Sequence, residues 1–452
     1  MKAQPDPQTQ VPQCQPRCSG HQMVWLRLLA ALLVQLGHPG VSLASGPLTS
    51  TDRLRQYMEQ IRPQPAAGQA GSQAVLEAAT VSPARLQERA ELLKAGESAL
   101  ERRDVSAALE AFERATVILH AADTEIAMAR TYMQNGEYRR ALAFGAHTAG
   151  SHLDVIGGAA LYAWFLHVGG QPALAQRLLA ASESRMPGHP VVVAVQQQLR
   201  SGSPVATGDL LTPPTRLAPY GDATGLPENA RVAGSGLLLP SGTAALVPLS
   251  LLPGSGKLWL RNGLGQLVKA KPDQRLTDLN VALVRLDSPL PVPEDLLVAA
   301  GEALPGSPGF AVEYISTPDA APAWPVLRAG FLGGTTGDAG TRLLGIDMPA
   351  GPRGGPVFDG AGHLIGLALP GASGTPIPSV PPAHSVPPVP SVAGADTLVT
   401  VSQLRKALSA ARAGEQLAVQ DLPTQNGPRP RGLVDKVYEA SLRSSLQVIT
   451  AP

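Results

Sequence analysis

The 452-residue sequence has few cysteines, few aromatic residues, little charge and no long apolar runs. It contains 2 Cys, 4% aromatic and 16% charged residues, with a net charge of +1. Both cysteines, Cys14 and Cys18, precede the first apolar run, and their spacing has no second pair, so we expect neither a zinc site nor a disulfide. The near-neutral charge gives no electrostatic footprint for nucleic acid.

The first apolar run, residues 25–36, is well short of the about 20 residues that span a bilayer. Small residues at 42–44 follow it, as at a signal-peptidase site, so we interpret residues 1–44 as a signal segment. A buried helix is the alternative, and either Met1 or Met23 could be the true start. We expect an exported protein, periplasmic or secreted, with no integral membrane span in the mature chain.

The remaining composition, with 44% hydrophobic residues, is that of a multidomain globular chain. Residues 45–84 are expected to hold a short helix and a linker, and helical periodicity runs over residues 85–200. Ala108, Ala141 and Ala175 recur there in matching contexts, with Gly136 and Gly170 before the second and third. This period of about 34 residues resembles tetratricopeptide repeats, although Arg103 stands where the first unit would have its glycine. An ordinary helical bundle is the alternative.

After a linker at 201–216, short apolar runs alternate with Gly/Pro turns over residues 217–411, which is typical of an all-β barrel or sandwich. A Pro-rich loop, 370–396, interrupts this part. The tail, 412–452, is expected to carry a C-terminal helix over 431–449, because its apolar residues recur at helical spacing. We expect this helix to dock on the chain itself; recruiting a partner is the alternative.

Three motifs of the β part appear in a suggestive order: "GSGLLLPSGTAALVPLSLL", "TDLNVALVRLD" and "GPRGGPVFDGAGHLIGL". They resemble the strands around the catalytic histidine, aspartate and serine of trypsin-like proteases of the HtrA type. The resemblance implies a fold class of multidomain α + β, with an N-terminal TPR-like solenoid followed by an all-β trypsin-like double β-barrel.

The same resemblance places the three catalytic positions on Ser250, Asn280 and Arg353. A guanidinium is no nucleophile, and acyl transfer needs a hydroxyl with an imidazole base and an orienting carboxylate, so the triad is degenerate. The sequence also has no histidine between Pro190 and Gly362. Catalytic activity would instead need an unusual dyad of Ser250 with Lys257. A register slip of the motif would place Asp278, rather than Asn280, in the carboxylate position.

The loop glycines Gly351, Gly354 and Gly355 are the remnant of the oxyanion loop that the resemblance implies. They could keep an anion site, or the turn could simply need glycine. Asp347 lies six residues before Arg353, where the resemblance implies the floor of the specificity pocket. An ion pair between the two residues is one interpretation, and two solvated side chains are the alternative. No metal-ligand or phosphate-loop spacing was found, and we expect no cofactor.

Two functions follow from these observations. The first is a non-catalytic envelope protein, with a protein or peptide partner bound by the TPR-like repeats and a pseudo-protease barrel as a second module. The second is an active trypsin-like serine endopeptidase. A chaperone role is compatible with the first.

Overall fold

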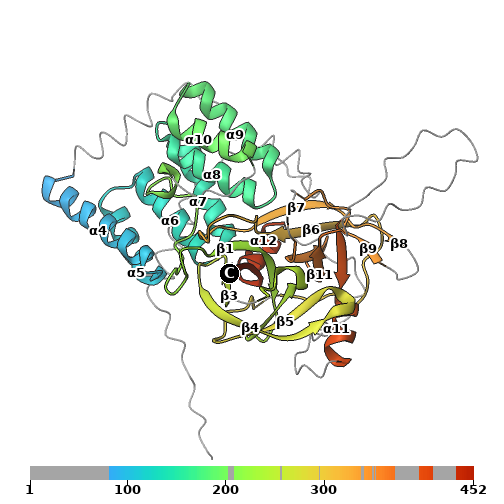
Figure 1. Cartoon of the computed structure of the whole chain (residues 1–452). Coiled ribbons are helices and arrows are strands. Elements are labelled where there is room, and N and C mark those ends of the chain that lie inside the picture. Colours follow the sequence, from blue (N-terminus) through green and yellow to red (C-terminus); the bar gives the residue numbers. More distant parts are fainter. Residues whose placement is uncertain are drawn as a thin grey trace, which may run out of the picture. The chain divides into compact units, whose positions relative to one another are not determined.

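The computed structural model describes residues 81–201, 208–254, 257–294, 296–336, 341–348, 351, 353–371, 396–410 and 434–451. The expected signal segment, nearly all of the following linker and most of the Pro-rich loop lie outside these residues. Within them, helices come first and strands follow (Figure 1). No described helix combines the length and apolarity needed to cross a bilayer.

The helical part is a row of helices in which neighbours along the chain pack together. The closest packing joins α4 to α5, α6 to α7 and α8 to α9, and α10 covers α8 and α9. The helices are α4 (Pro83–Glu101), α5 (Val105–Ile118), α6 (Ala122–Gln134), α7 (Tyr138–Ser151), α8 (Ile156–Val168), α9 (Pro172–Arg185) and α10 (Pro190–Ser201). The repeated alanines Ala108, Ala141 and Ala175 are fully buried in α5, α7 and α9, which explains why small residues recur there.

The turns inside the three helix pairs share one backbone conformation. Arg103, Gly136 and Gly170 all have positive φ, at 62°, 75° and 85°. Glycine takes this left-handed conformation without steric cost, whereas arginine does not. Arg103 therefore occupies the turn that the two later units build with glycine.

The first β unit is a closed barrel with the strand order β1-β13-β3-β4-β5-β2. Its core contains Leu238, Val247, Leu260, Val284 and Val448. The strands are β1 (Arg231–Leu238), β2 (Ala244–Pro248), β3 (Lys257–Asn262), β4 (Leu267–Leu276), β5 (Val281–Leu286) and β13 (Ser445–Ala451). Short 3-10 turns η2 (Leu249–Leu251) and η3 (Thr277–Leu279) follow β2 and β4, and η1 (Asp209–Leu211) precedes the barrel.

The second β unit is a seven-stranded sheet with the order β7-β6-β10-β11-β12-β9-β8. Its strands are β6 (Pro308–Glu313), β7 (Val326–Phe331), β8 (Thr335–Thr336), β9 (Thr341–Leu343), β10 (Pro356–Asp359), β11 (Leu364–Leu369) and β12 (Thr397–Thr400), and α11 (Val401–Ala410) follows. A helical array followed by two β units confirms the predicted fold class. This conclusion rests on the strand pairing within the closed barrel and the seven-stranded sheet.

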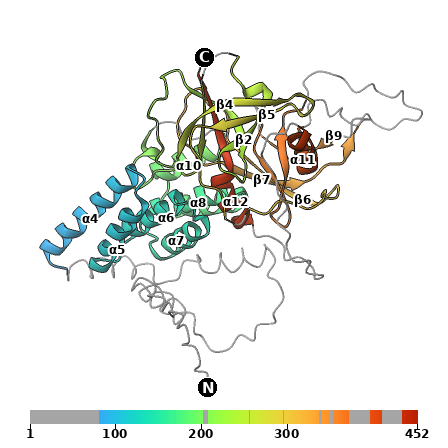
Figure 2. The same ribbon diagram turned by 90° about the horizontal axis from the view of Figure 1, so that it is seen from below.

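The C-terminal segment corrects two expectations. The predicted helix over 431–449 is wrong at its end, because α12 (Val434–Ser444) stops at Ser444 and the chain continues as β13. β13 pairs with both β1 and β3 and so completes the barrel from the far end of the chain (Figure 2). The expected β domain 217–411 consequently lacks one of its strands.

The helices contact the β part and its helix α12 through an ion pair, an aromatic contact and hydrogen bonds. Arg139 of α7 donates to Glu439 of α12 at 2.8 and 3.2 Å, and the Tyr138 and Tyr438 rings meet edge to face at 4.4 Å. Gln134 of α6 exchanges hydrogen bonds with the backbone of Tyr220, at 2.7 and 3.1 Å. The polar end of α6 is thus held by the segment that leads into the barrel.

Candidate functional site

Two of the three catalytic positions implied by the protease resemblance lie at one end of the first barrel. Ser250 is exposed in η2, directly after β2, and Asn280 is exposed directly before β5. β2 and β5 pair there, with Pro248 opposite Val281. The Leu249 amide donates to the Asn280 carbonyl at 2.9 Å, so the fold brings these two segments together.

The third position, Arg353, lies in the loop before β10 and is 6% exposed. Its Nε donates to Asp396 at 2.6 Å, and its Nη1 donates to the Gly351 carbonyl at 2.9 Å. Asp396 directly precedes β12, and its carbonyl accepts from Leu344, which places its carboxylate beside the loop. The acid paired with Arg353 is therefore Asp396, and Asp347, the partner left open by the sequence, is exposed.

The glycines that follow Arg353 are fixed by close packing. A Cβ on Gly354 would lie 2.0 Å from the Ser235 carbonyl and 2.6 Å from Pro248, and one on Gly355 would lie 1.9 Å from the Val312 carbonyl. Gly354 also has a φ of 136°. These contacts bring the loop against both β units and account for glycine at both positions without a ligand.

The amide groups of the same glycines already have an acceptor inside the protein. Glu313, at the end of β6, accepts from the Gly354 amide at 3.3 Å and from the Gly355 amide at 3.0 Å. Its side chain is buried, and its Oε2 has no hydrogen-bond partner among the described residues. Burial raises the pKa of Glu313 to about 7, while the hydrogen bonds and the nearby Arg353 charge act in the opposite direction.

The geometry does not favour either alternative catalytic arrangement, the Ser250–Lys257 dyad or Asp278 in the carboxylate position. Ser250 and Lys257 share no hydrogen bond in the part of the chain that the structure describes, and both are exposed. Asp278 is exposed in η3. The described residues thus offer Ser250 neither an imidazole nor an amine within hydrogen-bond reach.

A pocket of about 910 Å³ lies beside Ser250. Its walls come from β1, from the segment 250–254, from Ser316–Pro318 and from the end of β13. Among its described lining residues the charged one is Arg231. Its other described lining residues are apolar or carry hydroxyl groups.

Two helices of the array, α4 and α6, contact the segment that leads into the barrel. Tyr220 contacts Gln134 as described above, and its hydroxyl lies 3.4 Å from Glu97 of α4. Glu97 itself holds Arg130 of α6 through bonds of 2.6 and 3.0 Å. α4 and α6 are thus contacted by Tyr220, a residue that follows the expected linker.

Comparisons with known proteins give little beyond the fold. No protein-family model matches the chain, and no curated protein sequence matches it. One similar solved structure is described as "Crystal structure of Rv3671c protease, inactive form", with 14% identity, a TM-score of 0.29, 39% of this chain covered and 88% of that chain covered. Another is described as "HtrA-type protease AlgW with decapeptide", with 14% identity, a TM-score of 0.28 and coverage of 40% and 52% respectively. Both TM-scores are low.

Sequence reasoning did not identify Glu313 or Asp396 as site residues. Glu313 ends an apolar strand, "GFAVEY", where an isolated acidic residue on a buried strand could have marked an internal partner. Asp396 follows the Pro-rich loop and has no local signal, because only the pairing of β12 with β9 and β11 brings it to Arg353.

Proposed function

We propose that this chain is a non-catalytic protein of the cell envelope, in which the protease-like β part serves as a binding and structural module. The observation that carries the proposal is the occupied centre of the protease-like loop. Arg353 stands in the nucleophile position and is neutralised by Asp396, and Glu313 takes the loop amides. Substrate acylation needs a nucleophile and free amide donors in that place.

The proposal is tested by activity measurements on the purified mature chain. We expect no hydrolysis of casein or peptide esters and no labelling by a fluorophosphonate probe. Arg353→Ser should not restore activity, because a lone hydroxyl has no base to take its proton. Stoichiometric labelling of the unmodified chain that disappears in Ser250→Ala would instead establish the alternative, an active serine endopeptidase.

For the partner, we propose a protein or peptide segment bound in the pocket beside Ser250. The tetratricopeptide-like repeats would then orient the β part rather than hold the partner on α4 and α6, since Tyr220 contacts both of these helices. A photo-crosslinking residue at Ser250 should capture an envelope protein, and the same residue at exposed Glu110 of α5 should not. Capture from position 110 but not from position 250 would indicate that the helices, rather than the pocket, bind the partner.

A further inference from the structure

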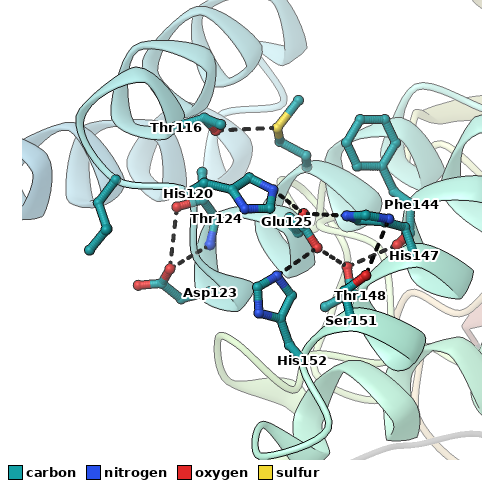
Figure 3. A network of polar contacts seen from close by, with 12 residues as sticks. Thr116, His120, Asp123, Thr124, Glu125, Phe144, His147, Thr148, Ser151 and His152 are labelled. Carbon is teal, nitrogen blue, oxygen red and sulfur yellow. Dashed lines mark hydrogen bonds and ion pairs between the residues drawn. The ribbon is translucent and has the colours of Figure 1, made fainter. Parts of the chain in front are cut away.

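Three histidines gather around one buried carboxylate in the helical array (Figure 3). Glu125 lies in the first turn of α6, and its side chain is 5% exposed. His120 comes from the link between α5 and α6, His147 from α7, and His152 from the residue that ends α7. Sequence spacing could not reveal this group, because its members come from separate segments and match no metal-binding motif.

The nitrogens of the three rings point at the carboxylate oxygens. Nε2 of His120 lies 2.6 Å and Nε2 of His147 lies 3.2 Å from Glu125 Oε1, and Nε2 of His152 lies 3.4 Å from Oε2. The donor atoms of His120, Glu125 and His152 all lie within 4.8 Å of one another. Ligands of a tetrahedral zinc ion, each about 2.1 Å from the metal, are separated by roughly 3.4 Å. The nitrogen–oxygen distances of His147 and His152 are close to this value, and that of His120 is shorter.

His152 is the most enclosed of the three rings, with a side chain that is 13% exposed. Its buried Nε2 faces Glu125 Oε2 at 3.4 Å but makes no well-aligned hydrogen bond to it. A metal ion bound to the nitrogen lone pair would give this weakly held atom a strong partner. The side chain of His120 is 50% exposed and that of His147 is 39% exposed, so an ion can enter from solvent and these rings can adjust.

The carboxylate is also oriented by a neighbour that is no ligand. The Thr148 hydroxyl lies 2.8 Å from Glu125 Oε2 and 2.8 Å from the Phe144 carbonyl. Gly158 of α8 packs on Thr148, since a Cβ there would lie 2.7 Å from the Thr148 methyl group. Ligating carboxylates in metal sites are held in this way by outer partners. Nearby Asp123 is paired with Arg89 and is therefore not counted among the ligands.

We propose that His120, Glu125 and His152, with His147 as the fourth ligand, bind one divalent transition-metal ion, with zinc as the preferred ion. Imidazole and carboxylate donors suit Zn²⁺, a d¹⁰ ion that has no redox chemistry of its own. The ion would tie the α5–α6 link and the start of α6 to the end of α7. Its role is therefore to stiffen the junction between successive helix pairs.

The test uses the full chain without a histidine tag and with Cys14→Ser and Cys18→Ser, so that neither a tag nor thiols compete for metal. After treatment with a chelator, zinc is titrated calorimetrically, and Co²⁺ is added separately to record the visible bands of a four-coordinate site. We expect one ion per chain, a higher melting temperature with zinc, and reversal of that shift by chelator.

Variants then separate binding from folding. His120→Ala and His152→Ala should each weaken zinc binding by more than about 100-fold, and Thr148→Val should weaken it about 10- to 100-fold, as outer-partner losses do. His363→Ala, in the second β unit, is the matched control and should leave binding unchanged. Melting without metal shows whether each variant is folded. Absence of stoichiometric zinc in the parent chain, or unchanged binding in the His120→Ala/His152→Ala double variant, would overturn the proposal.

Discussion

At the scale of single residues, Glu313 is a buried carboxylate whose hydrogen-bond partners belong to the protein itself. Its carboxylate fills the space in front of the Gly354 and Gly355 amides, and its neighbours are supplied by the fold rather than by solvent. Burial favours the protonated form, which is why its pKa rises to about 7. A group with a raised folded-state pKa stabilises the fold most at low pH.

Because of Glu313, the free energy of unfolding of the chain should depend on pH. The contribution of Glu313 is complete below the unfolded pKa of 4.5 and is lost as pH rises through about 7, a change of roughly 3 kcal/mol. Urea unfolding from pH 4.5 to 8 should show this fall for the parent chain relative to Glu313→Gln. Taking the difference removes the opposite contribution of His167, whose pKa burial lowers to about 4. Glu294→Gln, at an exposed glutamate, should leave the curve unchanged.

At the scale of elements, the sequence predicted helices over residues 85–200 and β structure over residues 217–411, because the periodicities of both are local. The repeated alanines and the turn glycines identified the helix pairs, and even Arg103 proved to share the left-handed conformation of Gly136 and Gly170. The strand β13 could not be predicted in this way. Leu446 and Ile449 fit a helical stripe, but in β13 they lie on opposite faces of a strand that is buried on both sides. Only the pairing with β1 and β3 decides between helix and strand.

The site was predictable only in part, for the same reason. The motif around Arg353 is local and marked the loop correctly as a close-packed turn. The partners of that loop, Glu313 and Asp396, come from strands that are distant in sequence, so burial and pairing had to be known first. The histidine group around Glu125 depends in the same way on how α6 packs against α7.

β13 should be indispensable to the barrel. A chain that ends at Ser444 leaves β1 and β3 without their shared neighbour, which opens the barrel and exposes the Trp259 cluster, in which Ile449 is packed. We expect loss of the thermal transition of the β part and red-shifted tryptophan fluorescence. Leu446→Ala, in the barrel core, should cost about 2–5 kcal/mol in urea unfolding.

An engineered cleavage site within residues 412–433 is the matched control for this truncation. That stretch carries none of the described barrel strands, so the cut chain should keep its C-terminal piece bound through β13. A truncated chain that melts like the parent would contradict the assignment of β13 as a barrel strand.

At the scale of the described molecule, the helical array and the β units share buried contacts as well as surface ones. Tyr138 and Tyr438 are both fully buried against each other, Tyr138 donates to the Phe165 carbonyl at 2.8 Å, and Tyr438 donates to the Pro325 carbonyl at 2.8 Å. Phe165 also meets Trp324 edge to face at 5.8 Å. Such contacts couple the unfolding of the parts they join, which argues against freely separable domains.

We therefore expect one cooperative thermal transition, with the helical signal in circular dichroism and tryptophan fluorescence changing together. Tyr138→Ala removes a buried ring from the junction and should cost about 3–5 kcal/mol, the range for large buried aromatic residues, and split the transition in two. Arg139→Ala removes only a partly exposed ion pair with Glu439, worth less than about 1 kcal/mol, and should keep a single transition. Two separate transitions in the parent chain would mean that the junction does not couple the unfolding of the two parts. The helices could then bind a partner independently of the β units.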